Sequence, residues 1–278
     1  MQNLWRKTSE LFWQYPILWL PILLANTLEW LLLWSQQILA RRIVTFFSQG
    51  HRSVLGGRPD LSTDPSTIMK ASLAAGLLSA GIYLLFTCLF ITALFVISKL
   101  VRNCLDNRPP ALKAAVIDTL QSCKRKTVVL SIKILALFPA GALLLIFAMP
   151  RLVRLTTMSY RDVGYSFSCI LTVVIAYLLT PSIVAALSPG RPVTSELLAK
   201  ARLIAMIGVA ASDLIGLFVQ RAELSVFTRS AYPSVPAQRL IGLTASLFTA
   251  FPYIPISIAL SVVAFSSQDY EEPTEPLH

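Results

Sequence analysis

The sequence predicts an all-α fold: a polytopic transmembrane helical bundle of about six spans, with additional interfacial amphipathic helices. Hydrophobic residues make up 55% of the 278 positions and charged residues only 14%, whereas a soluble domain carries roughly a quarter charged residues. Three runs, 71–98, 163–190 and 240–268, contain no Asp, Glu, Lys or Arg. A helix needs about 20 mostly apolar residues to cross a bilayer, so each run is long enough to span it.

The predicted spans divide one membrane domain, residues 1–268, into six helices. They lie near 17–38, 71–98, 128–150, 164–188, 203–220 and 240–265. The third is uncharged from Ile134 and reaches full length if the long Lys133 side chain extends back to the headgroups. The first and fifth each carry one intramembrane acid, and five spans are the main alternative. The tail 269–278 is acidic and polar, so we expect it to be flexible.

Residues 4–15 are predicted to form a first amphipathic helix that lies on the membrane surface. All five tryptophans fall within the first 34 residues. Indole rings prefer the headgroup level, so this pattern favours membrane anchoring over ligand stacking. The apolar face of the helix consists of Leu4, Trp5, Thr8, Leu11, Phe12 and Tyr15.

The loop after the second span contains a second predicted amphipathic helix, which begins at Pro109. Its apolar residues recur at helical spacing: Leu112, Val116, Leu120 and Cys123. Basic side chains lie off that face and are candidates for contact with anionic lipid headgroups: Lys113, Lys124, Arg125 and Lys126. A shorter basic helix, 196–202, precedes the fifth span.

The distribution of Lys and Arg orients the bundle. With six spans and a cytoplasmic N-terminus, 13 of these residues lie inside and 11 outside, and the densest cluster, 124–126, lies inside. The positive-inside rule therefore places both termini in the cytoplasm. The net charge of +10 is spread over span ends and loops. This spread favours a bilayer with anionic headgroups as the partner, and not a nucleic acid.

No catalytic signature occurs in the sequence. It lacks a Gly-x-Ser-x-Gly elbow, a His-Glu-x-x-His motif and a Walker-type glycine loop. The chain has two histidines and four cysteines without a Cys-x-x-Cys pair. We therefore expect no metal site, no cofactor and no enzyme activity.

The candidate functional residues are polar groups inside predicted spans. Asn26 and Glu29 share a helical face of the first span, and Asp213 lies in the fifth. A charge at the bilayer centre costs about 2.5–3.5 kcal/mol on insertion scales, so such a residue has a partner, faces water or is protonated. Three interpretations stay open: a proton or cation pathway, an acid that pairs and locks helix packing, or a first helix shallow enough for Glu29 to be hydrated.

Small residues at every fourth position predict two faces where helices approach closely. One face lies in the fifth span and the other in the second. Their members are Gly208, Ser212 and Gly216, and Ser72, Gly76 and Ala80.

Prolines inside the last span suggest a discontinuous helix. Phe251-Pro-Tyr-Ile-Pro255 removes two backbone donors within one turn. Broken helices of this kind line the binding sites of transporters. Proline kinks are also common in membrane helices without any binding role.

Two segments resemble a bacterial group of six-span proteins related to the membrane domain found beside some glycerophosphodiester phosphodiesterases. Trp13-Gln-Tyr-Pro-Ile-Leu-Trp-Leu-Pro21 is similar to that group's entry into its first helix. Residues 179–192, followed by Glu196-Leu-Leu-Ala-Lys-Ala-Arg202, are similar to its span exit and short basic helix. Pro189-Gly190 stands where an acidic-Gly pair is common, and the Ser-Trp of the basic helix is absent. The resemblance implies a helical membrane domain and carries over no catalytic residue.

The sequence favours a non-enzymatic scaffold or accessory subunit that packs against another membrane protein or a second copy of itself. The alternative is a transporter or permease component that uses Glu29 and Asp213. An integral-membrane enzyme acting on lipid comes third, because Asp162 and Glu223 are its only acidic candidates near span ends.

Overall fold

The computed structural model describes residues 2–52, 65–123, 125–134, 136–137, 151, 154, 160–187, 194–229 and 235–266, with the backbone alone over 40–52, 65–69, 220–229 and 235–239. Within these ranges the chain is helical and contains no strand, which confirms the all-α class. The elements are α1 (Gln2–Gln14), a 3-10 turn (Pro16–Leu18), α2 (Leu20–Arg52), α3 (Pro65–Leu105), α4 (Leu112–Ser122), α6 (Tyr160–Leu187), α7 (Ser195–Arg229), α8 (Val235–Ala250) and α9 (Tyr253–Ser266).

Five stretches of the described chain are long and apolar enough to cross a membrane. They are Pro16–Gln36, Gly76–Leu105, Cys169–Leu187, Ser195–Val219 and Leu240–Phe265. The remaining predicted span, 128–150, lies largely outside the described residues, although 125–134 are helical. At 1.5 Å per residue, the 41 residues of α3 extend for about 60 Å, so α3 continues well beyond a hydrocarbon core about 30 Å thick.

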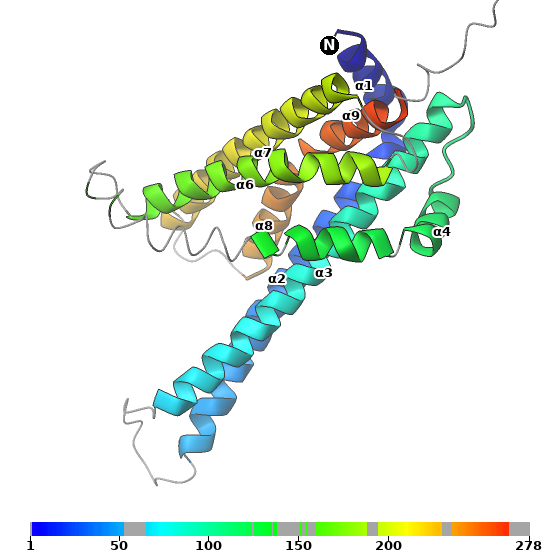
Figure 1. Ribbon diagram of the computed structural model, residues 1–278. Coiled ribbons are helices and arrows are strands. Elements are labelled where there is room, and N and C mark those ends of the chain that lie inside the picture. Colours follow the sequence, from blue (N-terminus) through cyan, green and yellow to red (C-terminus); the bar gives the residue numbers. More distant parts are fainter. Residues whose placement is uncertain are drawn as a thin grey trace, which may run out of the picture.

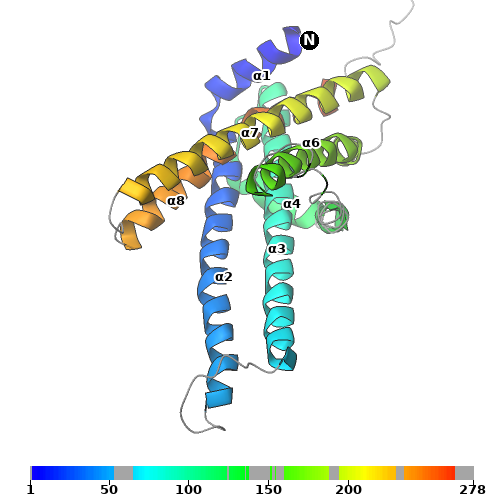
Figure 2. The same ribbon diagram turned by 90° about the vertical axis from the view of Figure 1, so that its left-hand side faces the viewer.

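Two helix pairs cross obliquely, with α9 between them. α2 and α3 form a long hairpin, and its far end projects away from the other helices in both views (Figures 1 and 2). α6 packs beside α7, and α8 packs against α2 and α7. α9 contacts α1, α3, α6 and α7, so it is the element that connects the hairpin with the α6–α7 pair.

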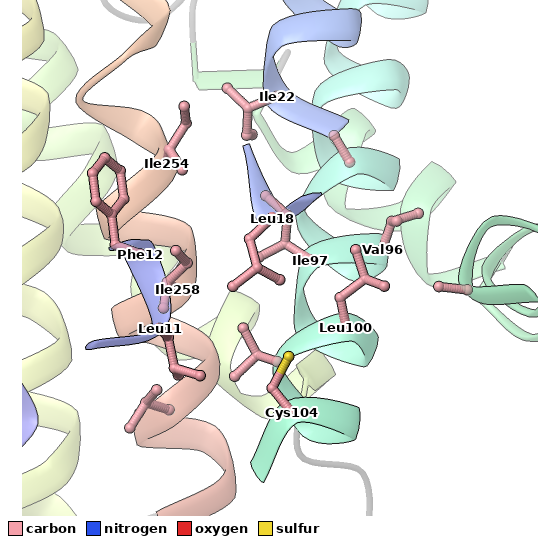
Figure 3. Close-up of a cluster of buried hydrophobic side chains, with 14 of the residues drawn as sticks. Leu11, Phe12, Leu18, Ile22, Val96, Ile97, Leu100, Cys104, Ile254 and Ile258 are labelled. Atoms are coloured by element: carbon pink, nitrogen blue, oxygen red, sulfur yellow. The ribbon is translucent and has the colours of Figure 1, made fainter. Parts of the chain in front are cut away.

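The core surrounds α9, which is apolar on all sides. Ile254, Ile258 and Val262 pack with α2 and α3, as Figure 3 shows for the first two. Ile256 and Val263 face the second cluster, formed with α6 and α7. A helix that is hydrophobic all round belongs in the interior, where its side chains are held by close van der Waals packing with the neighbouring helices.

The apolar face of α1 covers protein. Thr8, Leu11 and Phe12 are buried, and the last two lie in the cluster around Ile254 and Ile258 (Figure 3). Trp5, predicted to share that face, is 42% exposed. α1 therefore lies on α9, and its remaining exposed face is the part that is available to the membrane surface.

The buried face of α4 is not the predicted apolar stripe. Ala115, Thr119 and Cys123 are buried, while Leu120 is 58% exposed. Packing against α3 selects the stripe of small side chains, because these let the two helices approach each other closely. Of the predicted stripe, Cys123 is thus covered by protein, whereas Leu120 stays available to the membrane surface.

The basic helix predicted for residues 196–202 does not end before the fifth span. It forms the first two turns of α7, which runs unbroken from Ser195 to Arg229. Thr194 caps this start, where its hydroxyl accepts a 3.4 Å hydrogen bond from the backbone N–H of Leu197.

Candidate functional site

The last span is broken at residues 251–252, between α8 and α9, and we call this point the α8–α9 break. The discontinuous helix suggested by the two prolines is therefore present. Pro252 lacks a backbone donor, and the turn is closed by the N–H of Ile254, which donates to the carbonyl of Phe251 over 3.2 Å. Pro255 falls in the first turn of α9, where a missing N–H is tolerated.

Side chains of α7 occupy the position beside the break. The Ser212 hydroxyl donates a 2.8 Å hydrogen bond to the carbonyl of Thr249, one turn before Tyr253. The Tyr253 phenol and the Ser212 side chain interact electrostatically. Backbone groups released from a broken membrane helix need such partners, because the hydrocarbon offers none.

Gly208 is the reason that α7 can approach α9 so closely. A Cβ atom built at Gly208 would lie 2.1 Å from Cδ1 of Ile256. Only a residue without a side chain fits there unless Ile256 moves. Ser212, one turn further along the same face, is thereby held against the break.

α2 supplies a second polar anchor. The Asn26 side-chain amide donates to the carbonyl oxygen of Ser246 over 2.5 Å and lies 2.6 Å from its hydroxyl oxygen. The Thr249 hydroxyl donates to the same carbonyl over 2.8 Å. Polar groups of α2, α7 and α8 thus meet within two turns of the break.

Both intramembrane acids lie at this network. The Asp213 carboxylate accepts a 2.5 Å hydrogen bond from the hydroxyl of Thr172 on α6. The Tyr253 phenol interacts electrostatically with Asp213 and with Glu29. Glu29 and Asp213, which lie on helices far apart in the sequence, thus act on the same residue beside the break, and Asn26 joins α2 to α8 near it.

Glu29 has a different environment from Asp213. It is partly buried on α2 within a candidate span. The ion pairs among the described residues are Arg6–Glu10, Lys99–Asp118 and Lys200–Glu196, and Glu29 takes part in none of them. A carboxyl group in this position is stabilised by a proton, a bound cation or contact with water.

The two predicted small-residue faces have different surroundings. Gly208 and Ser212 pack against α8 and α9 as described, and Gly216 is partly buried on α7. A Cβ atom added at Gly76 would meet no other atom within 4 Å, Ala80 is exposed, and the side chain of Ser72 lies outside the described residues.

The four predicted lipid-binding cations also differ in their surroundings. Lys113 and Arg125 are exposed, and Lys124 lies outside the described residues. Lys126 donates to the carbonyl of Ala186 over 3.3 Å, in the last turn of α6, where a cation complements the negative end of the helix dipole.

Four members of the polar network are not predicted by the sequence patterns: Thr172, Ser246, Thr249 and Tyr253. Hydroxyl residues are common in membrane helices, and nothing in the spacing of the first three marks them. Tyr253 carries one usable signal, since a tyrosine directly follows the proline that breaks an apolar helix.

In the described part of the chain, no group of three or more His, Cys, Asp or Glu residues could hold a metal ion. Comparison of the chain with protein-family models, curated proteins and solved structures finds no match. Function is therefore inferred from the site alone.

Proposed function

We propose that the protein is a membrane transport component, and that a proton or a monovalent cation crosses the membrane by way of a site at the α8–α9 break. The observation that carries this proposal is that two acids from different helices, Glu29 of α2 and Asp213 of α7, both act electrostatically on Tyr253, the first residue of α9 after a broken helix. Broken spans with polar side chains and free backbone groups are a recurrent design of ion-coupled transporters.

The alternative role of the acids, to lock helix packing, accounts for part of the network. The hydrogen bond between Thr172 and Asp213 joins α6 to α7, and the Asn26–Ser246 contact joins α2 to α8. Neither contact requires the second carboxylate, Glu29. An acid without an ion pair in a candidate span is costly to retain for packing alone, which favours the transport role.

We further propose a bacterial cytoplasmic membrane with six spans and both termini in the cytoplasm. Its support is a set of basic residues at one end of the bundle, near α1 and the end of α9. Arg102 lies 5.9 Å from the ring centre of Phe265, and Lys126 contacts the end of α6. Arg202 lies 4.5 Å from the ring centre of Tyr177 near the start of α7. An accumulation of cations at one side is typical of the cytoplasmic face.

The orientation can be measured with single cysteines. Cys104 and Cys123 are buried, so the native thiols report burial and not the side of the membrane. In a variant without the four native cysteines, Arg108→Cys places a thiol in the exposed turn after α3. In intact cells it should resist a membrane-impermeant maleimide, and rapid labelling would reverse the proposed orientation.

The transport proposal is tested by purified protein in liposomes that contain the pH dye pyranine or a sodium-sensitive dye. A potassium diffusion potential drives cation entry. The wild type should pass protons or sodium ions faster than empty liposomes. Glu29→Gln and Asp213→Asn should each reduce the flux, and the double variant should match empty liposomes.

Two exposed acids provide matched controls: Glu10→Gln on α1 and Asp106→Asn after α3. Both should retain the wild-type flux. If Glu29→Gln and Asp213→Asn lower the melting temperature while the flux persists, the acids are packing elements. If the wild type passes neither ion, the transport proposal is wrong.

A scaffold or accessory subunit is the second candidate, and one observation favours it. The face of α3 around Gly76 is open, with Leu73 and Leu77 on the same helix 64% and 67% exposed. Such a surface can receive a helix of another membrane protein or of a second copy. Native mass spectrometry after gentle extraction would show a stoichiometric partner under this alternative.

A further inference from the structure

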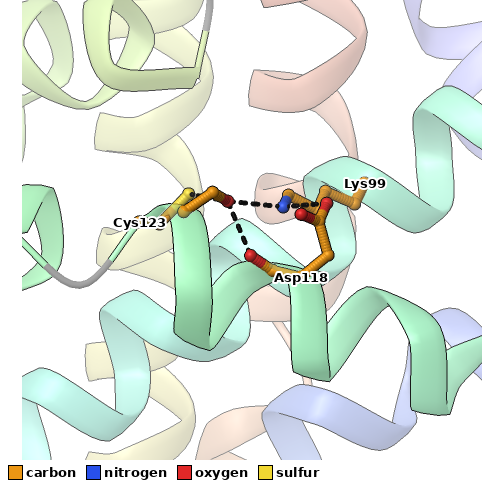
Figure 4. A network of polar contacts seen from close by, with 4 residues as sticks. Lys99, Asp118 and Cys123 are labelled. Atoms are coloured by element: carbon orange, nitrogen blue, oxygen red, sulfur yellow. Dashed lines mark hydrogen bonds and ion pairs between the residues drawn. The ribbon is translucent and has the colours of Figure 1, made fainter.

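α4 lies at the level where α3 leaves its apolar run. The uncharged segment 71–98 ends at Lys99. Lys99 pairs with Asp118 of α4 and donates a 2.9 Å hydrogen bond to the hydroxyl of Ser122 (Figure 4). These contacts hold α4 against the C-terminal part of the candidate span Gly76–Leu105.

The faces of α4 are sharply divided. Ala115 and Thr119 are buried toward α3, whereas Ile117 and Leu120 are 46% and 58% exposed. Lys113 shares the outer stripe, because positions i, i+4 and i+7 lie on one side of a helix. α4 therefore presents two aliphatic side chains and a cation on its outer face.

The helical residues 125–134 continue this pattern. Thr127, Leu130 and Ser131 are buried. The exposed side chains are Arg125, Val128, Val129, Ile132 and Lys133. An aliphatic stripe with a basic residue at each end thus follows directly on the outer stripe of α4.

The exposed charge of this region has one sign. Asp118 is the single acid between Pro109 and Ile134, and Lys99 already neutralises it. Lys126 is held by the carbonyl of Ala186. The cations left on the exposed side are Lys113, Arg125 and Lys133.

We propose that these two stripes, termed the α4 surface, bind the anionic phospholipid headgroups of one leaflet, with the aliphatic side chains inserted at the acyl boundary. Aliphatic stripes flanked by Lys and Arg are the composition of helices that lie in the membrane interface. Each basic residue near an anionic surface contributes about 1 kcal/mol. The α4 surface is separate from the α8–α9 break and does not depend on transport.

The first test counts retained lipids by native mass spectrometry of the full chain, extracted into micelles with equal amounts of phosphatidylglycerol and phosphatidylcholine. The variant Lys113→Gln/Arg125→Gln/Lys133→Gln removes the three cations. The control, Lys70→Gln/Arg151→Gln/Arg154→Gln, removes the same charge from exposed positions elsewhere. The first should lose affinity for phosphatidylglycerol by roughly 100-fold, while the control retains it.

Equal phosphatidylglycerol retention by wild type, variant and control would overturn the proposal. All three proteins should have the same melting temperature, because the six substituted side chains are exposed. If the triple variant fails to fold, the comparison is made with the wild type at rising salt, where phosphatidylglycerol should dissociate before phosphatidylcholine.

The second test measures how deeply the side chain at position 120 lies in the membrane. A bimane fluorophore on Leu120→Cys, in the cysteine-free chain and in phosphatidylglycerol-containing vesicles, should be quenched by nitroxide-labelled lipid and protected from aqueous iodide. Iodide quenching with no effect of lipid nitroxide would show that the α4 surface faces water, as expected if it binds a soluble acidic protein instead.

Discussion

The two ends of the molecule are packed in different ways. The packed end comprises α1, α9 and the adjoining parts of α3, α6 and α7, and it contains both clusters of buried side chains. The open end comprises α8, the second half of α7 and the N-terminal half of α3. There, Phe218 and Leu240 are 70% and 67% exposed.

The open end would be an aggregation hazard in water, where large exposed apolar patches promote association. In a bilayer the exposure of these side chains has no free-energy cost, because lipid tails are as apolar as leucine. The difference indicates that close packing determines the structure of the packed end, while the open end meets lipid or a partner. The functional candidates lie where the two ends join.

The largest expected difference between the ends comes from removing a large side chain. Ile258→Ala, at a fully buried position of α9, should lower the free energy of unfolding by about 2–5 kcal/mol, since it leaves a cavity. Leu77→Ala, on exposed α3, should change it by about 0.5 kcal/mol or less. Thermal unfolding in detergent measures both, and equal losses would contradict the comparison.

Adding a side chain at a glycine should give the next largest difference in stability between the two ends. Gly208→Val forces α7 away from Ile256 and should lower the free energy of unfolding by about 1–3 kcal/mol. Gly76→Val meets open space on α3 and serves as the matched control. A shift in melting temperature for the control alone would indicate that Gly76, and not Gly208, lies at a helix contact.

At the junction of the packed end and the open end, Asn26→Ala should lower the free energy of unfolding by about 1 kcal/mol. It removes the side-chain contacts to Ser246, and hydrogen bonds between membrane helices average about 0.6 kcal/mol, with a maximum near 1.7. A double-mutant cycle with Ser246→Ala isolates the contact between the two side chains. A coupling energy of zero would mean that the backbone carbonyl of Ser246 carries the interaction.

The smallest effect is expected at the Lys99–Asp118 ion pair. Asp118 is mostly exposed, and exposed ion pairs contribute roughly 0–1 kcal/mol. Lys99→Met should therefore leave the melting temperature nearly unchanged. It should loosen α4, measured as faster amide hydrogen exchange at Ala115 and Thr119; unchanged exchange would show that apolar packing alone positions this helix.

Sequence patterns predicted the helices that depend on composition and spacing. The apolar run 71–98 lies within α3, and Pro252 with Pro255 marks the broken last span. The burial of Ala115 and Thr119 on α4 was not predicted, because periodicity identifies an apolar stripe without showing which face of the helix a neighbour will cover. The continuation of residues 196–202 into α7 was also missed, because nothing in a basic first turn marks whether the helix continues into the span.

The candidate site shows the same limit. Asn26, Glu29 and Asp213 are visible in the sequence as polar residues in apolar surroundings, since the cost of burying such groups makes them conspicuous. Their placement around the α8–α9 break depends on contacts between residues far apart along the chain, such as Asn26 and Ser246. Spacing along one helix carries no information about these contacts.

The sequence by itself determined the class, the long apolar helices, the broken last span and the presence of intramembrane acids, because hydrophobicity and proline geometry act locally. Only the tertiary structure decided that α9 is the centre of the core, that Gly208 lets α7 reach the break, and that the two acids share one polar network. These features depend on which helices pack together, and side-chain shape and hydrogen bonding across helices select that arrangement.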